Sequence, residues 1–231
     1  MPAAWALVPI KPFADAKSRL AGLLSRAECT RLAAEMARDV LRALAATPDI
    51  SGIALLSREP EAARLINDGT AGYGGTTRLY PELPDEDFRH GLARVAADLA
   101  AHGVRHLLVL PTDLPTLSSA DIGALLTEHG HGTGITVCRA TPDGGTNALV
   151  LSPPTVIPLL YGPQSADRHL EAARAAGVAA RECHLTAFAR DVDTPDDMKW
   201  LLEQRVACAT LAWLKASGIR ERLRERSHAP R

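Results

Sequence analysis

Alternation of short apolar strands with amphipathic helices is the feature that most constrains the fold of this chain. Strand patterns lie at residues 5–10, 52–56, 104–110, 135–139, 147–151 and 188–192, and helical patterns fill most intervals between them. The near-continuous apolar run at 104–110 is typical of a parallel strand buried on both faces. The two strand patterns around Asp143-Gly144-Gly145 predict a hairpin. We therefore predict an α/β unit with a mostly parallel, mixed sheet.

Helix boundaries follow from capping signals. Ser25 and Glu28 match a capping box that opens a long helix ended by Pro48, and Thr194 with Pro195 predicts another helix start. Four glycines between residues 69 and 76 predict a flexible loop near a binding cleft. We assign residues 1–205 to the α/β domain and 206–231 to a separate helical tail, frayed from residue 227 onward.

Size and charge exclude several classes of protein. The chain has 231 residues and a formal net charge of −1, so it can bury a large core and has no overall basic field for nucleic acid. No apolar run is long enough to span a bilayer, and Lys11 and Pro12 interrupt any signal-peptide pattern. Four separated cysteines are typical of reduced thiols in a cytoplasmic protein. His129 and His131 flank a glycine and are expected to be solvated.

Three cations follow the first strand. Lys11, Lys17 and Arg19 lie on the loop beyond its carboxyl end, where open α/β sheets bind ligands. Arginine and lysine are the usual partners of phosphate, so we expect these residues to hold a polyphosphate, with Ser18 in the same nucleotide site. The loop lacks the glycine-rich and Gly-Lys-Ser/Thr phosphate motifs, so side chains would provide most of the contacts.

Three aspartates are candidate metal ligands. Asp113 follows the buried strand between two prolines, and Asp191 and Asp193 are two residues apart on a predicted strand, so their carboxylates would share a face. Like charges this close need a cation, and Mg²⁺ prefers carboxylates with phosphate oxygens. Alternatively, Asp113 satisfies turn amides and Asp193 caps the next helix. Asp191-Val192-Asp193-Thr194 also resembles the nucleophile motif of haloacid-dehalogenase phosphatases, but it lies at the wrong end of the domain for that class.

Two further segments contain donors for an anion. Thr146 and Asn147 follow two glycines that allow close backbone approach, although this segment also fits an ordinary hairpin turn. Gly162 and Ser165 precede a helix whose free amides would bind an anion, and Arg168 adds charge. Ser165 as a simple N-cap is a compatible alternative, and His169 fits a helix-surface or packing role.

These segments, in this order, resemble the guanylyltransferases of coenzyme F-420 biosynthesis, within the group that includes the molybdenum-cofactor guanylyltransferases. The resemblance covers residues 5–203. Its motifs are Pro9-Ile10-Lys11-Pro12, Ala16-Lys17-Ser18-Arg19-Leu20, Leu110-Pro111-Thr112-Asp113-Leu114-Pro115, Gly145-Thr146-Asn147-Ala148-Leu149, Gly162-Pro163-Gln164-Ser165 with Arg168-His169, and Asp191-Val192-Asp193-Thr194-Pro195.

The resemblance implies a Rossmann-like three-layer α/β/α nucleotidyltransferase fold in a cytoplasmic enzyme. The implied reaction moves GMP from GTP to a phosphorylated three-carbon acid, which is 3-phospho-D-glycerate, phosphoenolpyruvate or 2-phospho-L-lactate, and releases pyrophosphate. The matching positions imply the ligand-binding residues. Mg²⁺ would be bound by Asp113, Asp191 and Asp193, and the GTP phosphates by Lys11, Lys17 and Arg19. The acceptor would be bound by Thr146, Gly162 and Ser165, with Asn147 and Arg168 beside them. Catalysis itself is expected to depend on Lys17, Arg19 and Asp113.

One departure from the family pattern concerns the nucleotide base. Members usually have Gly-Leu-Asn at the start of the helix before the buried strand, whereas this chain has Gly91-Leu92-Ala93. A nucleotidyltransferase with another acceptor, such as molybdopterin or a sugar phosphate, and a non-catalytic nucleotide-binding module are the alternatives. The expected partners are the two substrates, with neither nucleic acid nor membrane, and the tail helix is a candidate homodimer contact.

Overall fold

The computed structural model describes residues 3–13, 16–141 and 143–228; Pro142 of the predicted turn and residues 229–231 of the predicted frayed end lie outside this part. Seven strands form one sheet in the order β3-β2-β1-β4-β6-β5-β7. Within it, only β6 runs against its neighbours. The strands are β1 (Ala4–Ile10), β2 (Ile50–Ser57), β3 (Thr76–Pro81), β4 (Leu107–Val109), β5 (Gly134–Arg139), β6 (Thr146–Ser152) and β7 (Ala179–Cys183).

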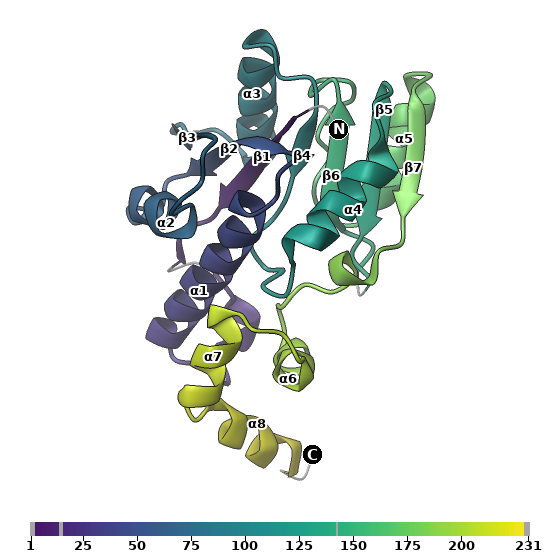
Figure 1. The fold of residues 1–231 in the computed structure, drawn as a ribbon. Helices are drawn as coiled ribbons and strands as arrows, with labels where there is room; N and C mark the ends of the chain where they lie inside the picture. The colour runs from purple at the N-terminus through teal and green to yellow at the C-terminus, as the bar shows by residue number, and fades with distance from the viewer. Residues whose placement is uncertain (1–2, 14–15, 142, 229–231) are drawn as a thin grey trace.

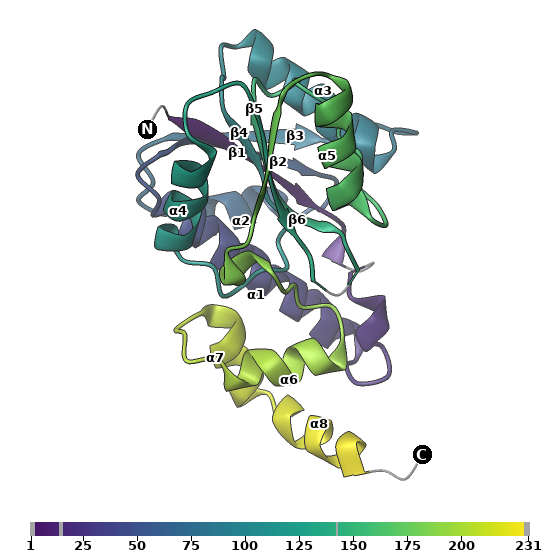
Figure 2. The same cartoon turned by 90° about the vertical axis from the view of Figure 1, so that its right-hand side faces the viewer.

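Helices cover both faces of this sheet, as Figures 1 and 2 show. They are α1 (Arg26–Ala45), α2 (Ala62–Gly69), α3 (Phe88–Ala101), α4 (Ser119–His129), α5 (Ser165–Ala175), α6 (Pro195–Glu203), α7 (Ala209–Ala216) and α8 (Ile219–His228), with short 3-10 turns η2 (Ser18–Leu20) and η3 (Thr186–Phe188). The predicted α/β fold with a mostly parallel mixed sheet is therefore confirmed. None of the helices in the described ranges is long and apolar enough to cross a membrane.

The sheet separates two apolar cores. Helices α1, α2 and α4 pack on one face, where Val8 of β1 and Leu108 of β4 are fully buried. Helices α3 and α5 pack on the other, over Leu7 and Val109. Adjacent residues of β1 thus point into different cores, which explains why its sequence is apolar throughout rather than alternating. This double burial holds the carboxyl ends of β1 and β4 in fixed positions.

A third cluster lies beyond that edge of the sheet. Residues of α6, α7 and α8 pack against the start of α1 and the loop before it, with Leu20 and Met198 fully buried at the centre. The predicted tail is thus two short helices, α7 and α8, joined around Gly218, whose φ of +67° fits a helix-ending glycine. Asp39 of α1 fixes the start of α7, because its carboxylate accepts hydrogen bonds from the amides of Ala209 and Thr210 at 2.8 Å each.

Several boundaries differ from the sequence predictions. Residues 188–192 are not a strand: η3 ends at Phe188 and an irregular segment leads into α6. The two edge strands, β3 and β7, were not predicted, because both are mostly exposed and therefore lack an apolar pattern. The capping boxes at Ser25 and Thr194 are both present, so these helix starts are confirmed.

The prediction that His129 is solvated is wrong. Its ring lies 2.7 Å from Ser152 Oγ through Nε2 and 2.9 Å from Thr136 Oγ1 through Nδ1, and Ser152 Oγ also lies 2.6 Å from His106 Nδ1. Burial and the neighbouring His106 together lower the pKa of His129 to about 4. This polar cluster lies at the amino ends of the parallel strands, opposite the loops that follow β1 and β4.

Candidate active site

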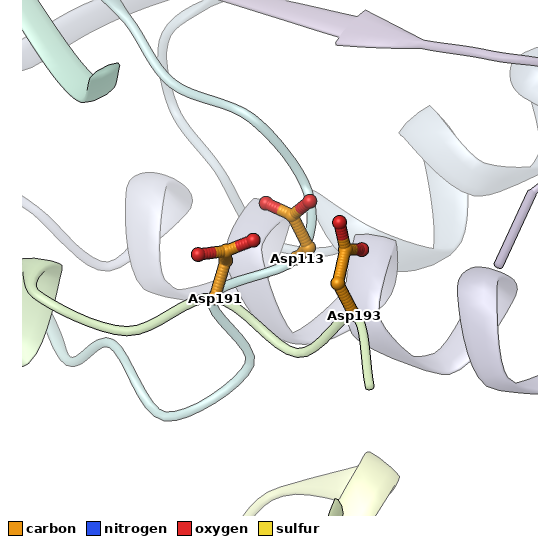
Figure 3. A group of neighbouring side chains, drawn as sticks. All are labelled: Asp113, Asp191 and Asp193. Carbon is orange, nitrogen blue, oxygen red and sulfur yellow. The ribbon is translucent and has the colours of Figure 1, made fainter. Parts of the chain in front are cut away.

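Three carboxylates meet beyond the carboxyl end of β4. Asp113 lies in the proline-bounded loop after β4, and Asp191 and Asp193 come from the irregular segment between η3 and α6. One oxygen from each lies within 4.8 Å of the others, and Figure 3 shows all three side chains turned toward a common space. The amide of Val192 donates to the carbonyl of Asp113 at 3.0 Å, which ties the two segments together. The predicted convergence therefore occurs without the strand that was expected to produce it.

The negative charge of these aspartates is only partly balanced. Desolvation and the nearby charge of Asp113 together raise the pKa of Asp191 to about 6. Asp113 Oδ1 is buried and has no hydrogen-bond partner among the described residues. Unpaired buried polar atoms are costly, and an oxygen left open in a cluster of acids is the expected state of a ligand for a cation.

Lys17 supplies one positive charge to this cluster. Its ammonium donates to Asp193 Oδ1 at 2.5 Å and to Asp113 Oδ2 at 3.4 Å, and the exposed fractions of the three side chains are 8%, 37% and 25% in that order. Burial alone would lower the pKa of Lys17, but attraction to Asp113 and Asp193 outweighs it and the pKa is raised. Lys17 therefore faces the carboxylates directly.

Hydrogen bonds hold the segment that carries Asp191 and Asp193. Asp197, in the first turn of α6, accepts from the amides of Asp193 at 3.2 Å and Thr194 at 2.8 Å. Upstream, the side-chain amide of Asn147 donates to the carbonyl of Phe188 at 2.9 Å. Asn147 was predicted at the acceptor site, and this bond also gives it a structural role in positioning the acids.

The aspartates lie where two pockets meet. The larger pocket, of about 590 Å³, is lined by Asp113 and Asp191, and the smaller, of about 340 Å³, by Asp113 and Asp193. Pro9, Lys11, Phe88 and Pro111 line both, so the two form one continuous cleft. A ligand that spans this cleft would pass the carboxylates near its middle.

The smaller pocket contains the predicted phosphate residues. Lys17 and Arg19 line it together with Lys11, and Lys11 and Arg19 are exposed. The Lys11 ammonium also lies 5.6 Å from the centre of the Phe88 ring, a cation–π distance. The side chain of Ser18, predicted at the same site, lies outside the described part of the structure.

The larger pocket contains the predicted acceptor residues: Thr146, Asn147, Gly162, Ser165 and Arg168. Ser165 is not the N-cap of α5, because Gln164 occupies that position in a left-handed conformation. Instead Ser165 Oγ lies 2.9 Å from Thr146 Oγ1, which is 3.1 Å from His169 Nδ1. His169 accepts from the amide of Leu160 through Nε2 at 2.8 Å, so it fixes both hydroxyls and the loop that contains Gly162.

Sequence reasoning missed one wall of the larger pocket. Asp87, Phe88 and Arg89 at the start of α3 line it, and Tyr161 packs edge-on against Phe88 with 6.0 Å between ring centres. The N-cap position of Asp87, whose carboxylate accepts from two amides of α3, was the available signal. Ala93, at the position where the resemblance predicts an asparagine, is exposed and is not part of the lining of either pocket.

This arrangement has the elements of a phosphotransfer site. The carboxylate oxygens suit a hard divalent cation, the cations of the smaller pocket suit phosphates, and the hydroxyls of the larger pocket suit a small oxygen-rich anion. An ion held by the aspartates would contact ligands in both pockets. The geometry therefore supports reactions between two anionic substrates.

Comparison with known proteins agrees with this chemistry. A family model described as "Guanylyl transferase CofC like" matches residues 4–229. The phosphoenolpyruvate guanylyltransferase of Roseiflexus sp. (strain RS-1) is 35% identical over 199 residues, covering 86% of this chain and 85% of the relative. That of Rubrobacter xylanophilus is 35% identical over 197 residues, covering 84% and 91%.

A solved structure shows the same fold at lower identity. A protein from Desulfovibrio desulfuricans G20, assigned as a nucleotide-diphospho-sugar transferase, superimposes with a TM-score of 0.76 at 15% identity, covering 97% of this chain and 98% of that chain. The likeness includes the helices α7 and α8, because nearly the whole chain is covered.

Proposed function

This chain belongs to the CofC-like guanylyl transferase family, and we propose that it moves GMP from GTP to phosphoenolpyruvate, with release of pyrophosphate, in coenzyme F-420 biosynthesis. The choice of this acceptor over 3-phospho-D-glycerate and 2-phospho-L-lactate is supported by the names of the relatives at about 35% identity. The three acids differ by a hydroxyl, a double bond and the position of the phosphate.

The position of the aspartates carries this proposal. They lie at the junction between a smaller pocket that contains Lys17 and Arg19 and a larger pocket that adds hydroxyls and glycines to its own cations. Transfer of a nucleotide requires the α-phosphorus and the acceptor phosphate to meet, with the pyrophosphate directed away from the acceptor. A junction with cations on both sides supports that alignment, because two anionic substrates can approach the aspartates from opposite directions.

The reaction needs alignment and charge neutralisation more than proton transfer. A phosphate oxygen of the acceptor attacks the α-phosphorus in line, a new oxygen–phosphorus bond forms, and the bond to the β-phosphate oxygen breaks. That acceptor oxygen is already an anion near neutral pH, so a strong general base is not required. Asp113, Asp191 and Asp193 would hold Mg²⁺, which supplies Lewis acidity and neutralises phosphate charge when bound.

The cationic side chains have distinct tasks in this scheme. Arg19 and Lys11 line the smaller pocket and would neutralise the charge that develops on the departing pyrophosphate. Without metal, Lys17 holds Asp113 and Asp193 at their spacing through its ammonium. When these oxygens bind Mg²⁺, the displaced ammonium would contact the transferred phosphate.

On the acceptor side, fixed hydroxyls would orient the acid. Thr146 and Ser165 are both buried and share a hydrogen bond, and the ring of His169 forms a second hydrogen bond with the Thr146 hydroxyl. Arg168, whose guanidinium lies beside Gly162, would pair with the carboxylate of the acceptor.

One set of incubations tests the proposal. The protein is mixed with GTP, Mg²⁺ and each of the three acids, and pyrophosphate release is followed with product identification by mass spectrometry. Release with phosphoenolpyruvate well above that with the other two acids is expected. Equal or greater release with another acid would refute the choice of acceptor, and release with none of them would refute the function. Parallel reactions with ATP and CTP measure the preference for the guanine base, because Gly91-Leu92-Ala93 departs from the family pattern that concerns this base.

A further inference from the structure

Helix α8 holds the loop that carries Lys17 and Arg19. Arg222 of α8 donates through Nη1 to the carbonyl of Leu23 at 3.0 Å and to Glu28 Oε2 at 3.1 Å, and through Nη2 to Glu28 Oε1 at 2.5 Å. Arg222 and Glu28 are 194 residues apart in sequence. One guanidinium therefore joins the C-terminal helices to both the end of the loop and the start of α1.

Glu28 transmits this contact to the helix start. Its carboxylate also accepts from the amide of Ser25 at 2.8 Å and from its hydroxyl at 2.9 Å, which completes the capping box of α1. The hydrogen bond from Arg222, together with those from Ser25 and against the effect of burial, lowers the pKa of Glu28 to about 2. Glu28 is therefore charged, and Arg222 holds it, throughout the neutral range.

Two turns of backbone lead from Leu23 back to Lys17. The amide of Leu23 donates to the carbonyl of Leu20 at 2.8 Å, and the amide of Leu20 donates to the carbonyl of Lys17 at 2.9 Å. Lys17 itself has a φ of +59°, a left-handed conformation that costs a residue with a side chain about 1 kcal/mol or more. Such a conformation persists only where the surroundings hold it.

The same helices also pack beneath the aspartates. Leu223 and Ile219 of α8 share the third apolar cluster with Leu20 of the loop and with Val192, which lies between Asp191 and Asp193. Displacement of α8 would thus loosen both the cationic loop and the acidic segment. Figure 2 shows α6, α7 and α8 grouped below the sheet on the side of α1.

We infer that Arg222 is a positioning residue that holds the Lys17–Leu24 loop in the conformation needed for nucleotide transfer. This inference rests on the proposed function for its kinetic readout. An ion pair this exposed, at 38% for Arg222 and 26% for Glu28, contributes little to global stability. The added bond to the Leu23 carbonyl is what makes the contact specific. Only the planar fork of arginine reaches a carboxylate and a carbonyl together, so lysine is not an equivalent replacement.

The test compares Arg222→Gln and Arg222→Lys with Arg220→Gln. Arg220 is on the same helix, and its side chain makes no hydrogen bond or ion pair within the described residues, so its variant matches the change in charge. For both Arg222 variants we expect kcat/KM for GTP to fall about tenfold, as misplacement of reacting groups predicts. For Arg220→Gln we expect a change within about twofold. All rates are measured at a temperature at which thermal unfolding curves show that the variants are folded.

A second variant separates positioning from stability. Glu28→Gln keeps a capping-box residue at the third position of α1 but removes the charge that Arg222 pairs with. It should show a similar kinetic loss, and the double variant with Arg222→Gln should lose little more than either single variant, because both break one contact. Full addition of the two losses would contradict a shared contact.

Hydrogen exchange gives a readout that does not need turnover. Amides of residues 17–24 should exchange faster in Arg222→Gln than in the wild type, whereas those of β1 and β4 should not change. If Arg222→Gln lowers the melting temperature but leaves both kcat/KM and the exchange of 17–24 unchanged, the residue is only structural and the inference fails. If wild-type protein transfers GMP to none of the acids, the proposed function fails, while the exchange experiment still decides the role of Arg222.

Discussion

Replacing Lys17 with methionine should destabilise the protein in the absence of divalent cations. Methionine keeps the length and apolar stem of lysine, so the change removes mainly the ammonium that contacts Asp193 and Asp113. Breaking a fully buried ion pair costs about 3–5 kcal/mol, and an exposed pair contributes about 0–1 kcal/mol. Lys17 is 8% exposed, but its partners are 25% and 37% exposed, so we expect a loss of about 2 kcal/mol. For a chain of this size that lowers Tm by about 4–8 °C.

A divalent cation should reverse this loss. With the ammonium gone, the three carboxylates repel one another and a cation meets no competitor for their oxygens. In the wild type the same cation must displace Lys17 from two of its ligands, so it binds more weakly. If Lys17→Met binds Mg²⁺ about tenfold more tightly, saturating metal stabilises the variant by about 1.4 kcal/mol more than the wild type.

The assay is thermal unfolding in EDTA and in millimolar Mg²⁺, followed by circular dichroism. Arg19→Met is the matched control: it removes a cation from the same loop, but Arg19 is exposed and makes no ion pair with the aspartates. Its Tm should match the wild type under both conditions. An equal rise in Tm with Mg²⁺ for Lys17→Met and the wild type would refute the idea that ammonium and metal compete for one site.

Three further outcomes are expected. Asp113→Asn should lower kcat about 10³-fold, because one buried charge that faces the reacting phosphates is lost, with melting curves showing an intact fold. Ser165→Ala should raise KM for the acceptor about tenfold and leave KM for GTP unchanged, since the hydroxyl lines only the larger pocket; initial rates with each substrate varied test this. His129 has a folded-state pKa of about 4, below its ordinary value of about 6.5, so its contribution to stability is complete above pH 6.5 and is lost as pH falls toward 4. Tm measured across that range should fall, and should fall less in His129→Gln.

Much of the fold could be predicted from local signals. The capping box at Ser25 and the N-cap Thr194 followed by Pro195 marked helix starts because these signals act within four residues, and the apolar run of β4 marked a strand buried on both faces. The edge strands β3 and β7 could not be recognised, because an edge strand pairs on one side only and needs little apolar surface. Burial of His129 depends on Ser152, 23 residues away, and no local pattern shows such a partner.

The convergence of the aspartates was predicted for a partly wrong reason. The rule that open α/β sheets bind ligands at the carboxyl ends of their strands placed Asp113 correctly, since residues that follow parallel strands gather at one edge of the sheet. For Asp191 and Asp193 the alternation of a strand was assumed, whereas hydrogen bonds from Val192 to Asp113 and from Asp193 to Asp197 hold an irregular segment in place. Side chains two residues apart point to the same side both in a strand and in this irregular segment. The convergence of the carboxylates was therefore predicted correctly, although the predicted strand does not form.

The sequence of the loop alone does not distinguish the roles of Lys17 and Arg19. Both are cations on one loop, two residues apart, and sequence groups them as phosphate ligands. The left-handed backbone at Lys17 directs its ammonium between two carboxylates, while Arg19 remains exposed in the smaller pocket. A non-glycine residue adopts that conformation only where tertiary contacts enforce it. Here Asp113 and Asp193 hold the Lys17 ammonium, and α8 contacts the same loop further on, at Leu23. Of these two cations, Arg19 is thus the one left unpaired by the aspartates, and the difference is set by tertiary contacts that the loop sequence does not contain.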